Sequence, residues 1–166
     1  MRILSVIKNI FSNDFYVQIW PENLRILNIT TGESYEDVPL ITLKYDRNGK
    51  PVIEAIGSDS NKLKNCPGYK VLNPFDHPRL LVKDFQAAEK VLMHTFRLLH
   101  QSKIFAPSPR VIIQPMEKLE GGVTDVEMRL YRELCLGAGS REVVVYLGKP
   151  LHKSTINYEQ VKSKSS

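Results

Sequence analysis

Glycines flank an apolar run near the end of the chain, between Gly137 and Leu151, where the sequence reads GAGSREVVVYLGKPL. A glycine turn beside a buried strand often lets backbone amides approach a phosphate, so this stretch is a candidate nucleotide site. Gly121 and Gly122 form a second glycine pair before a helical pattern. The phosphate-loop pattern GxxxxGK[ST] does not occur in the sequence, so we expect a flexible loop at this pair.

The side chains that could act as bases, nucleophiles or metal ligands are scattered. His94 and His100 are six residues apart and would face different directions on a helix, and no histidine has a nucleophile or second ligand at a recognisable spacing. Cys66 and Cys135 lack CxxC or Cys/His spacing, which predicts two buried reduced thiols. We therefore expect no catalytic residue, no metal site and no cofactor.

The polar cluster at Thr124, Asp125 and Glu127 has a structural explanation. Thr124 precedes an amphipathic run, and Glu127 follows it by three residues, which is the spacing of a capping box. A cap of this kind stabilises a helix by about 0.5 to 2 kcal/mol. Gly137 ends the run, where we expect a left-handed helix terminus.

Composition favours one domain with its own core, since the chain has 166 residues, of which 42% are hydrophobic. The formal charge of +5 is spread along the chain without a nucleic-acid-binding motif, so nucleic acid is not the expected partner. No apolar run approaches the ~20 residues of a membrane span, and no cleavage site follows the apolar start. We expect a cytoplasmic protein.

Residues 1–11, MRILSVIKNIF, form a short basic amphipathic pattern. Such a segment can lie in a bilayer interface, which would make the protein peripheral at the inner membrane; the alternative is that it packs on its own domain. The candidate membrane contacts are Ile3, Leu4, Ile7, Lys8, Ile10 and Phe11.

The pattern of elements predicts an α/β fold. Residues 15–38 read as two or three antiparallel strands, and the Asn48-Gly49 pair predicts a hairpin turn between two more. Residues 84–103 predict a helix capped by Asp84. Two apolar strands then flank the run that begins at Thr124, and this strand, helix, strand order favours a parallel pair.

Three stretches of the chain resemble the bacterial actin family, the MreB rod shape-determining proteins. They read FSNDF, PSPRVIIQP and VTDVEMRLYRELCLGAGSREVVVYLGKPL. The pieces TDVE, RE, GAG and REV fall at the family's spacing, and the similarity runs in order from about Met1 to Leu151.

The resemblance implies the first half of an actin-like ATPase fold, which is ribonuclease H-like, with a mixed sheet, helices and a small inserted subdomain. Residues 12–151 would form this domain after the segment 1–11. Residues 152–166 match no part of the family, and we expect a divergent, partly disordered tail in which Tyr158 or Val161 covers apolar surface and Lys162 to Ser166 lack order.

One departure from the family concerns its first phosphate loop, which reads Asp-Leu-Gly-Thr-x-Asn-Thr. This chain has QIWPENL at that place. Trp20 adds bulk, Pro21 removes an amide donor and Glu22 adds a negative charge, and each of these changes opposes ATP binding. The residues of this degenerate loop are Gln18, Trp20, Pro21, Glu22, Asn23 and Leu24.

A second departure follows the last apolar strand, where the family's Glu-Glu-Pro supplies an acid implicated in positioning the attacking water. This chain has Gly148 and Lys149 before Pro150, so the acids are lost. The family's second phosphate loop lies beyond the end of the chain, and we expect only one side of a nucleotide cleft.

These departures predict a non-catalytic MreB-like protein linked to cell shape or the cytoskeleton. It would act through protein contacts with MreB or a cell-wall component, and a half-length subunit could cap or modulate a filament. A homodimer is an alternative way to cover the apolar face that a missing half would expose. The alternative functions are a residual ATP-binding protein and a basic interaction module reassigned to another partner.

Overall fold

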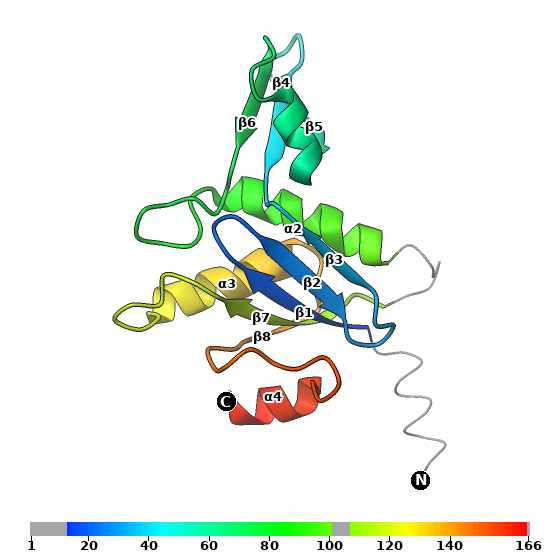
Figure 1. Cartoon of the computed structure of the whole chain (residues 1–166), viewed down its shortest axis with the longest axis vertical. Coiled ribbons are helices and arrows are strands. Elements are labelled where there is room, and N and C mark those ends of the chain that lie inside the picture. The colour runs from blue at the N-terminus through cyan, green and yellow to red at the C-terminus, as the bar shows by residue number, and fades with distance from the viewer. Residues whose placement is uncertain (1–12, 101–106, 166) are drawn as a thin grey trace.

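A five-stranded mixed sheet forms the centre of the computed structural model, which describes residues 13–100 and 107–165 (Figure 1). The first three strands are antiparallel neighbours, and the last two run parallel to the first, in the order β3-β2-β1-β7-β8. This confirms the predicted α/β order. The strands are β1 (Asp14–Ile19), β2 (Leu24–Asn28), β3 (Ser34–Asp37), β7 (Arg110–Pro115) and β8 (Glu142–Val145).

Two helices, α2 (Phe85–Leu99) and α3 (Asp125–Gly137), pack on one face of this sheet. The Asp84 side chain accepts a hydrogen bond from the Ala87 amide at the start of α2, and Thr124 forms the predicted capping box with Glu127. The predicted left-handed terminus at Gly137 is wrong by two residues. Gly137 still belongs to α3, and it is Gly139 that has a φ of +107°.

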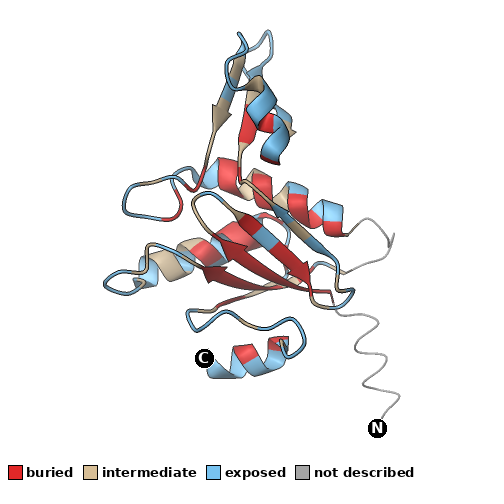
Figure 2. Ribbon diagram, in the orientation of Figure 1, coloured by how far each residue is buried: buried red, intermediate tan, exposed pale blue. Residues whose placement is uncertain are grey.

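Alternation along β1 divides the interior into two layers. Phe15, Val17 and Ile19 point toward α2 and α3, whereas Tyr16 points to the opposite face. Figure 2 shows the buried residues concentrated in β1 and β7 and on the sides of α2 and α3 that face the sheet. Cys135 lies in the first layer, but Cys66 is exposed, so the expectation of two buried thiols is half right.

A third helix, α4 (Tyr158–Lys164), covers the second face of the sheet. We expected Lys162 to Ser166 to lack order, but the helix continues through Lys164 and is capped by the Asn157 side chain, which accepts from the Gln160 amide. Tyr158 and Val161 are buried against this face. The tail is therefore part of the fold as far as the structure describes it.

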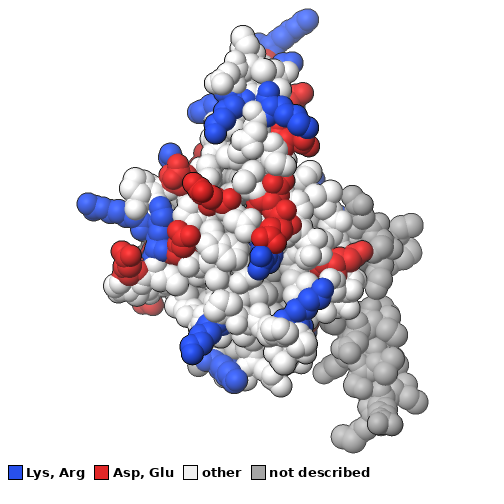
Figure 3. Space-filling view, viewed as in Figure 1, with Lys and Arg blue, Asp and Glu red and all other residues white. Residues whose placement is uncertain are grey.

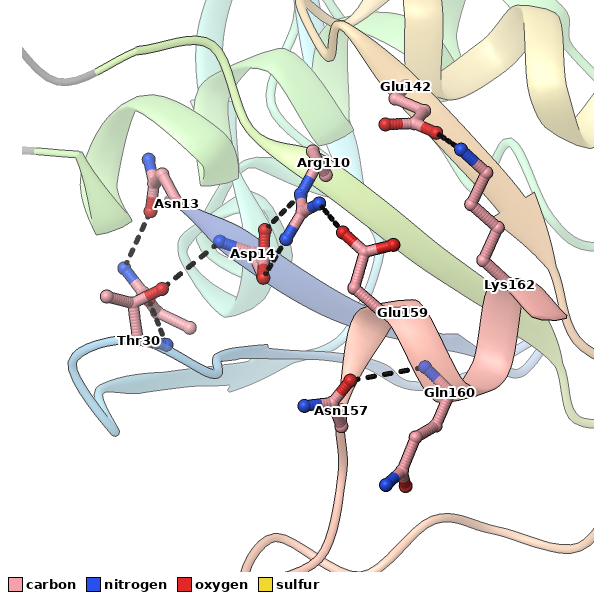
Figure 4. A network of polar contacts seen from close by, with 10 residues as sticks. Asn13, Asp14, Thr30, Arg110, Glu142, Asn157, Glu159, Gln160 and Lys162 are labelled. Atoms are coloured by element: carbon pink, nitrogen blue, oxygen red, sulfur yellow. Dashed lines mark hydrogen bonds and ion pairs between the residues drawn. The ribbon is translucent and has the colours of Figure 1, made fainter. Parts of the chain in front are cut away.

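Ion pairs connect α4 to the sheet (Figure 4). The Arg110 guanidinium on β7 donates two hydrogen bonds of 2.8 Å to the Asp14 carboxylate and one of 2.5 Å to Glu159. It also lies 4.3 Å from the centre of the Tyr158 ring. Hydrogen bonds to Asp14 and Glu159 raise the pKa of Arg110, so this side chain stays charged.

A second, three-stranded sheet extends beyond α2, as Figure 1 shows at the top of the view. It consists of β4 (Ile41–Tyr45), β5 (Pro51–Ile56) and β6 (Tyr69–Leu72) in the order β5-β4-β6, and the 3₁₀-helix η1 (Gly57–Leu63) lies against it. The Asn48-Gly49 turn joins β4 to β5, as predicted. The N-cap residue of this 3₁₀-helix is Ile56, whose apolar side chain accepts no capping hydrogen bond.

The candidate membrane segment at residues 1–11 lies outside the described residues. Within residues 13–100 and 107–165, the model contains no helix of the length and apolarity that crossing a bilayer requires.

Candidate functional site

The degenerate loop forms the turn between β1 and β2, at the carboxyl end of the parallel strands, where α/β folds commonly bind ligands. It borders an open pocket of about 440 Å³. The pocket lining combines the turn with two residues that follow β7: Trp20, Pro21, Glu22, Asn23, Glu117 and Lys118. Glu117 and Lys118 were not predicted from the sequence, because they lie beside the turn only through the parallel pairing of β7 with β1.

Backbone groups of the turn are hydrogen-bonded within the protein. The Trp20 amide donates to the Asn23 carbonyl over 2.8 Å, and Pro21 has no amide hydrogen. The Pro21 carbonyl accepts a 2.6 Å hydrogen bond from the Asn73 side chain, which comes from the segment after β6. Two successive positions of the turn therefore offer no amide to a phosphate.

Asn23, the one residue that matches the family's loop, is used within the protein. Its Nδ2 donates to Glu36 Oε1 over 3.0 Å, and Arg25 donates two hydrogen bonds to the same carboxylate. These hydrogen bonds, the one from Arg25 first, lower the pKa of Glu36. The Arg25 guanidinium also lies 5.8 Å from the centre of the Trp20 ring. Together these contacts hold the turn against β3.

Gln18, which the sequence resemblance aligns with the family's metal-site aspartate, has a buried side chain. Its Nε2 lies 3.4 Å from the Met116 sulfur. A neutral amide in this place supplies no negative charge for a divalent cation. Leu24 is fully buried in the main core and points away from the pocket.

Gly148 is exposed after β8, and the half-buried ring of Tyr146 lies beside it. Gln114 Nε2 donates to the Gly148 carbonyl over 2.6 Å, and the Tyr16 hydroxyl donates to Gln114 Oε1. A Cβ atom added at Gly148 would lie 2.5 Å from ring carbon Cζ of Tyr146. The Tyr146 ring therefore takes the space into which a side chain at position 148 would point, although Gly148 and Lys149 are both exposed to solvent.

The remaining sequence candidates have structural contacts. His100 is hydrogen-bonded to the Asn13 side chain, His77 Nδ1 accepts from the Arg79 and Leu80 amides, and His152 contacts Ser154. Burial lowers the pKa of His100. Burial, and then the positive charge of Arg97, lower the pKa of His94. In the part of the chain that the structure describes, no three histidine, cysteine or acidic side chains are grouped as metal ligands would be.

Comparison with known proteins identifies relatives of this chain, although no family model matches it. The cell shape-determining protein MreB of Escherichia coli strain K12 is 31% identical over 144 residues, which cover 85% of this chain and 40% of that protein. MreB of Haemophilus influenzae is 27% identical over 138 residues, which cover 82% of this chain and 38% of that protein. The chain thus spans about 40% of the length of these relatives.

Solved structures agree with these relatives in fold. MreB5 of Spiroplasma citri bound to AMPPNP superposes with a TM-score of 0.59 at 16% identity, over 81% of this chain and 38% of that one. A non-polymerising MamK mutant bound to AMPPNP gives the same TM-score at 10% identity, over 81% and 41%. The chain has an actin-like fold, and over about 85% of its length it is homologous to the MreB cell-shape proteins.

Proposed function

We propose that this chain is a non-catalytic, MreB-like cytoplasmic protein that acts on the bacterial cytoskeleton through protein contacts. The observation that carries the proposal is the turn from Trp20 to Asn23, in which the Trp20 amide, the Pro21 carbonyl and the Asn23 side chain are hydrogen-bonded within the protein. A phosphate site needs backbone amides that point at the ligand. This turn withholds two of them, through the Trp20 to Asn23 hydrogen bond and through Pro21.

Charge also favours a non-catalytic role. Glu22 and Glu117 border the pocket with Lys118, and the Lys118 ammonium donates to the His77 carbonyl. A carboxylate about 4 Å from a phosphate oxygen costs about 1 kcal/mol in water and about 4 kcal/mol near a protein surface. Gln18 provides no anion to bind the magnesium that would offset this repulsion.

The position of the Tyr146 ring argues against a hydrolytic glutamate at position 148. A glutamate there requires Tyr146 to move, and Tyr146 packs against the layer beneath α4. The proposal therefore assigns this chain neither ATP binding nor ATP hydrolysis.

The similarity to MreB proteins suggests the cellular context of the proposal. The chain's relatives are cell shape-determining proteins, and its 166 residues correspond to about 40% of one such subunit. A chain of this size could contribute part of a subunit's contacts to a filament, and binding at an end would cap or modulate it. Residues 1–11 would add a peripheral membrane contact, and a homodimer is the alternative assembly.

Co-sedimentation with filaments of purified E. coli MreB tests the protein contact. We expect the 166-residue chain to pellet with the filaments, or to change their length, while the same amount of chain alone stays in the supernatant. If the chain leaves both filament length and its own distribution unchanged, the filament role is wrong. A pull-down from the native host would then identify the partner.

A further inference from the structure

The far end of the small sheet carries a concentration of positive charge. We expected the positive charge to be spread along the chain, but between Lys44 and Lys70 there are six lysines and arginines and three acidic residues, so this stretch holds +3 of the chain's net charge of +5. Figure 3 shows lysine and arginine side chains gathered over the small sheet, at the top of the view. We call the β4–β5 turn with its flanking residues, Lys44 to Ile53, together with residues 64–70, the tip.

Two of the three acids near the tip, Asp46 and Asp59, are occupied by local contacts, and the third, Glu54, is exposed beside Ile53 outside the tip. Asp46 Oδ1 accepts from the Asn48 and Lys50 amides over 2.8 and 2.9 Å, so this carboxylate shapes the turn. Asp59 on η1 pairs with Lys62 over 2.7 Å. The exposed cations of the tip are Lys44, Arg47, Lys50, Lys64 and Lys70.

Large apolar side chains are exposed among these cations. Tyr45 and Val52 are each 49% exposed, and Ile53 is 42% exposed. Val52 pairs with Lys44 and Ile53 pairs with Leu43. Because adjacent residues of a strand point to opposite faces, Val52 and Ile53 present apolar surface on both sides of the hairpin.

Apolar surface on both faces of the hairpin favours some anionic partners over others. The partners to compare are a folded protein, a nucleic acid and a lipid bilayer. A folded protein surface would cover one face of the hairpin and leave the other in water. Nucleic acid would engage the cations through its phosphates but would gain little from aliphatic side chains such as Val52 and Ile53. The headgroup region of a bilayer can surround both faces, take up apolar side chains and attract cations if its lipids are anionic.

We propose that the tip of the small sheet docks onto anionic phospholipid membranes, with Val52 and Ile53 among the lipids and Lys44, Arg47 and Lys50 at the headgroups. This contact is independent of residues 1–11, to which the proposed function assigns its own membrane contact. The two can be separated, because they lie in different parts of the sequence and each can be changed alone in the full chain.

Sedimentation with vesicles measures the contact, using the full chain in an Ile7→Glu, Phe11→Glu background to weaken the first segment. We expect binding to vesicles of phosphatidylserine and phosphatidylcholine, and little binding to phosphatidylcholine alone. Lys44→Gln with Arg47→Gln should weaken binding by about tenfold or more. The matched control, Arg129→Gln with Arg132→Gln on α3, removes the same charge and should bind as the background does.

The apolar part of the contact has its own pair of variants. Val52→Ser with Ile53→Ser should weaken binding by about fivefold or more, since bilayer affinity scales with the apolar area buried. Val126→Ser with Leu136→Ser, two exposed residues of α3, is the control and should change it less than twofold. Thermal melts of each variant confirm that the fold is retained.

Cys66 provides a direct readout because it lies on the tip and is exposed, whereas Cys135, the other thiol, is fully buried. A polarity-sensitive dye on Cys66 should shift to the blue when anionic vesicles are added. Unchanged dye emission, equal binding by tip and control variants, or binding to DNA or RNA without binding to vesicles would each overturn the proposal. Loss of vesicle binding only in the residue 1–11 variant would overturn it while leaving the proposed function intact.

Discussion

Gly148 and Tyr146 show how one residue identity is fixed by packing. The sequence comparison marks Gly148 only as a missing acid, whereas the structure shows the Tyr146 ring in the space that a side chain would need. Tyr146 is half-buried and packs on the second face of the sheet with Tyr16 and Ile112, so a shift of its ring alters contacts in that layer. Restoring an acid at this position therefore requires the Tyr146 ring to shift.

Gly148→Ala tests this packing. Its Cβ would lie 2.5 Å from Tyr146 Cζ, so the ring must shift, and we expect the free energy of unfolding to fall by about 1 kcal/mol, the low end of the cost of overpacking, because Gly148 is exposed. Urea denaturation measures the change. Lys149→Ala is the control, and as an exposed substitution it should change stability by no more than about 0.5 kcal/mol. Equal effects of the two variants would contradict the account.

Buried tyrosines predict a loss of stability at alkaline pH. Burial raises the pKa of Tyr131 to about 12, with a further increase from Glu127, and the pKa of Tyr35 is also raised to about 12, by burial and then by Asp37. In the unfolded chain these groups ionise near pH 10. Their contribution is complete below pH 10 and is lost as the pH rises toward 12, because the unfolded state then binds fewer protons.

Tyr131→Phe isolates one of these groups. Between pH 10 and 12 the wild-type chain should lose about 1 to 2 kcal/mol more stability than the variant, as measured by urea denaturation at each pH. Identical pH dependence in the two proteins would show that Tyr131 ionises at its ordinary pKa.

At the scale of elements, the sequence predicted the order of strands and helices because each core element carries its own pattern. The capping box at Thr124 and the turn at Asn48-Gly49 are local signals, and both were confirmed. Helix α4 was missed because its seven residues bury only Tyr158 and Val161, too few to set a period. Its stability depends on the sheet face beneath it, which no local pattern reveals.

The contacts of the candidate site were also beyond sequence reasoning. The loop from Trp20 to Asn23 was identified as degenerate, but its partner Asn73 is 52 residues from Pro21 in the sequence. Glu117 and Lys118 join the pocket only because β7 lies parallel to β1. Spatial neighbours of this kind follow from topology, which a single sequence determines only in outline.

Two substitutions at Tyr158 test whether α4 packs as described. The Tyr158 hydroxyl is buried and, among the described residues, has no hydrogen-bond partner. Tyr158→Phe should therefore leave the free energy of unfolding unchanged or raise it by up to about 1 kcal/mol, since no hydrogen bond is lost. Tyr158→Ala should lower it by about 3 to 5 kcal/mol. Similar losses in both variants would contradict a hydroxyl without a partner.

At the scale of the whole molecule, the two sheets meet around the degenerate turn. Asn73, from the segment that returns from the small sheet, binds the Pro21 carbonyl, and Lys118 after β7 binds the His77 carbonyl. These long-range hydrogen bonds join the two sheets at the turn between β1 and β2.

Calorimetric titration with Mg-ATP tests the central claim, that this MreB-like chain does not bind nucleotide. Purified E. coli MreB under the same conditions serves as the positive control. We predict no saturable heat for the 166-residue chain up to millimolar Mg-ATP, because Pro21 and the Trp20 to Asn23 hydrogen bond remove amide donors and Gln18 supplies no negative charge for the metal. Saturable binding with a micromolar dissociation constant would contradict the account.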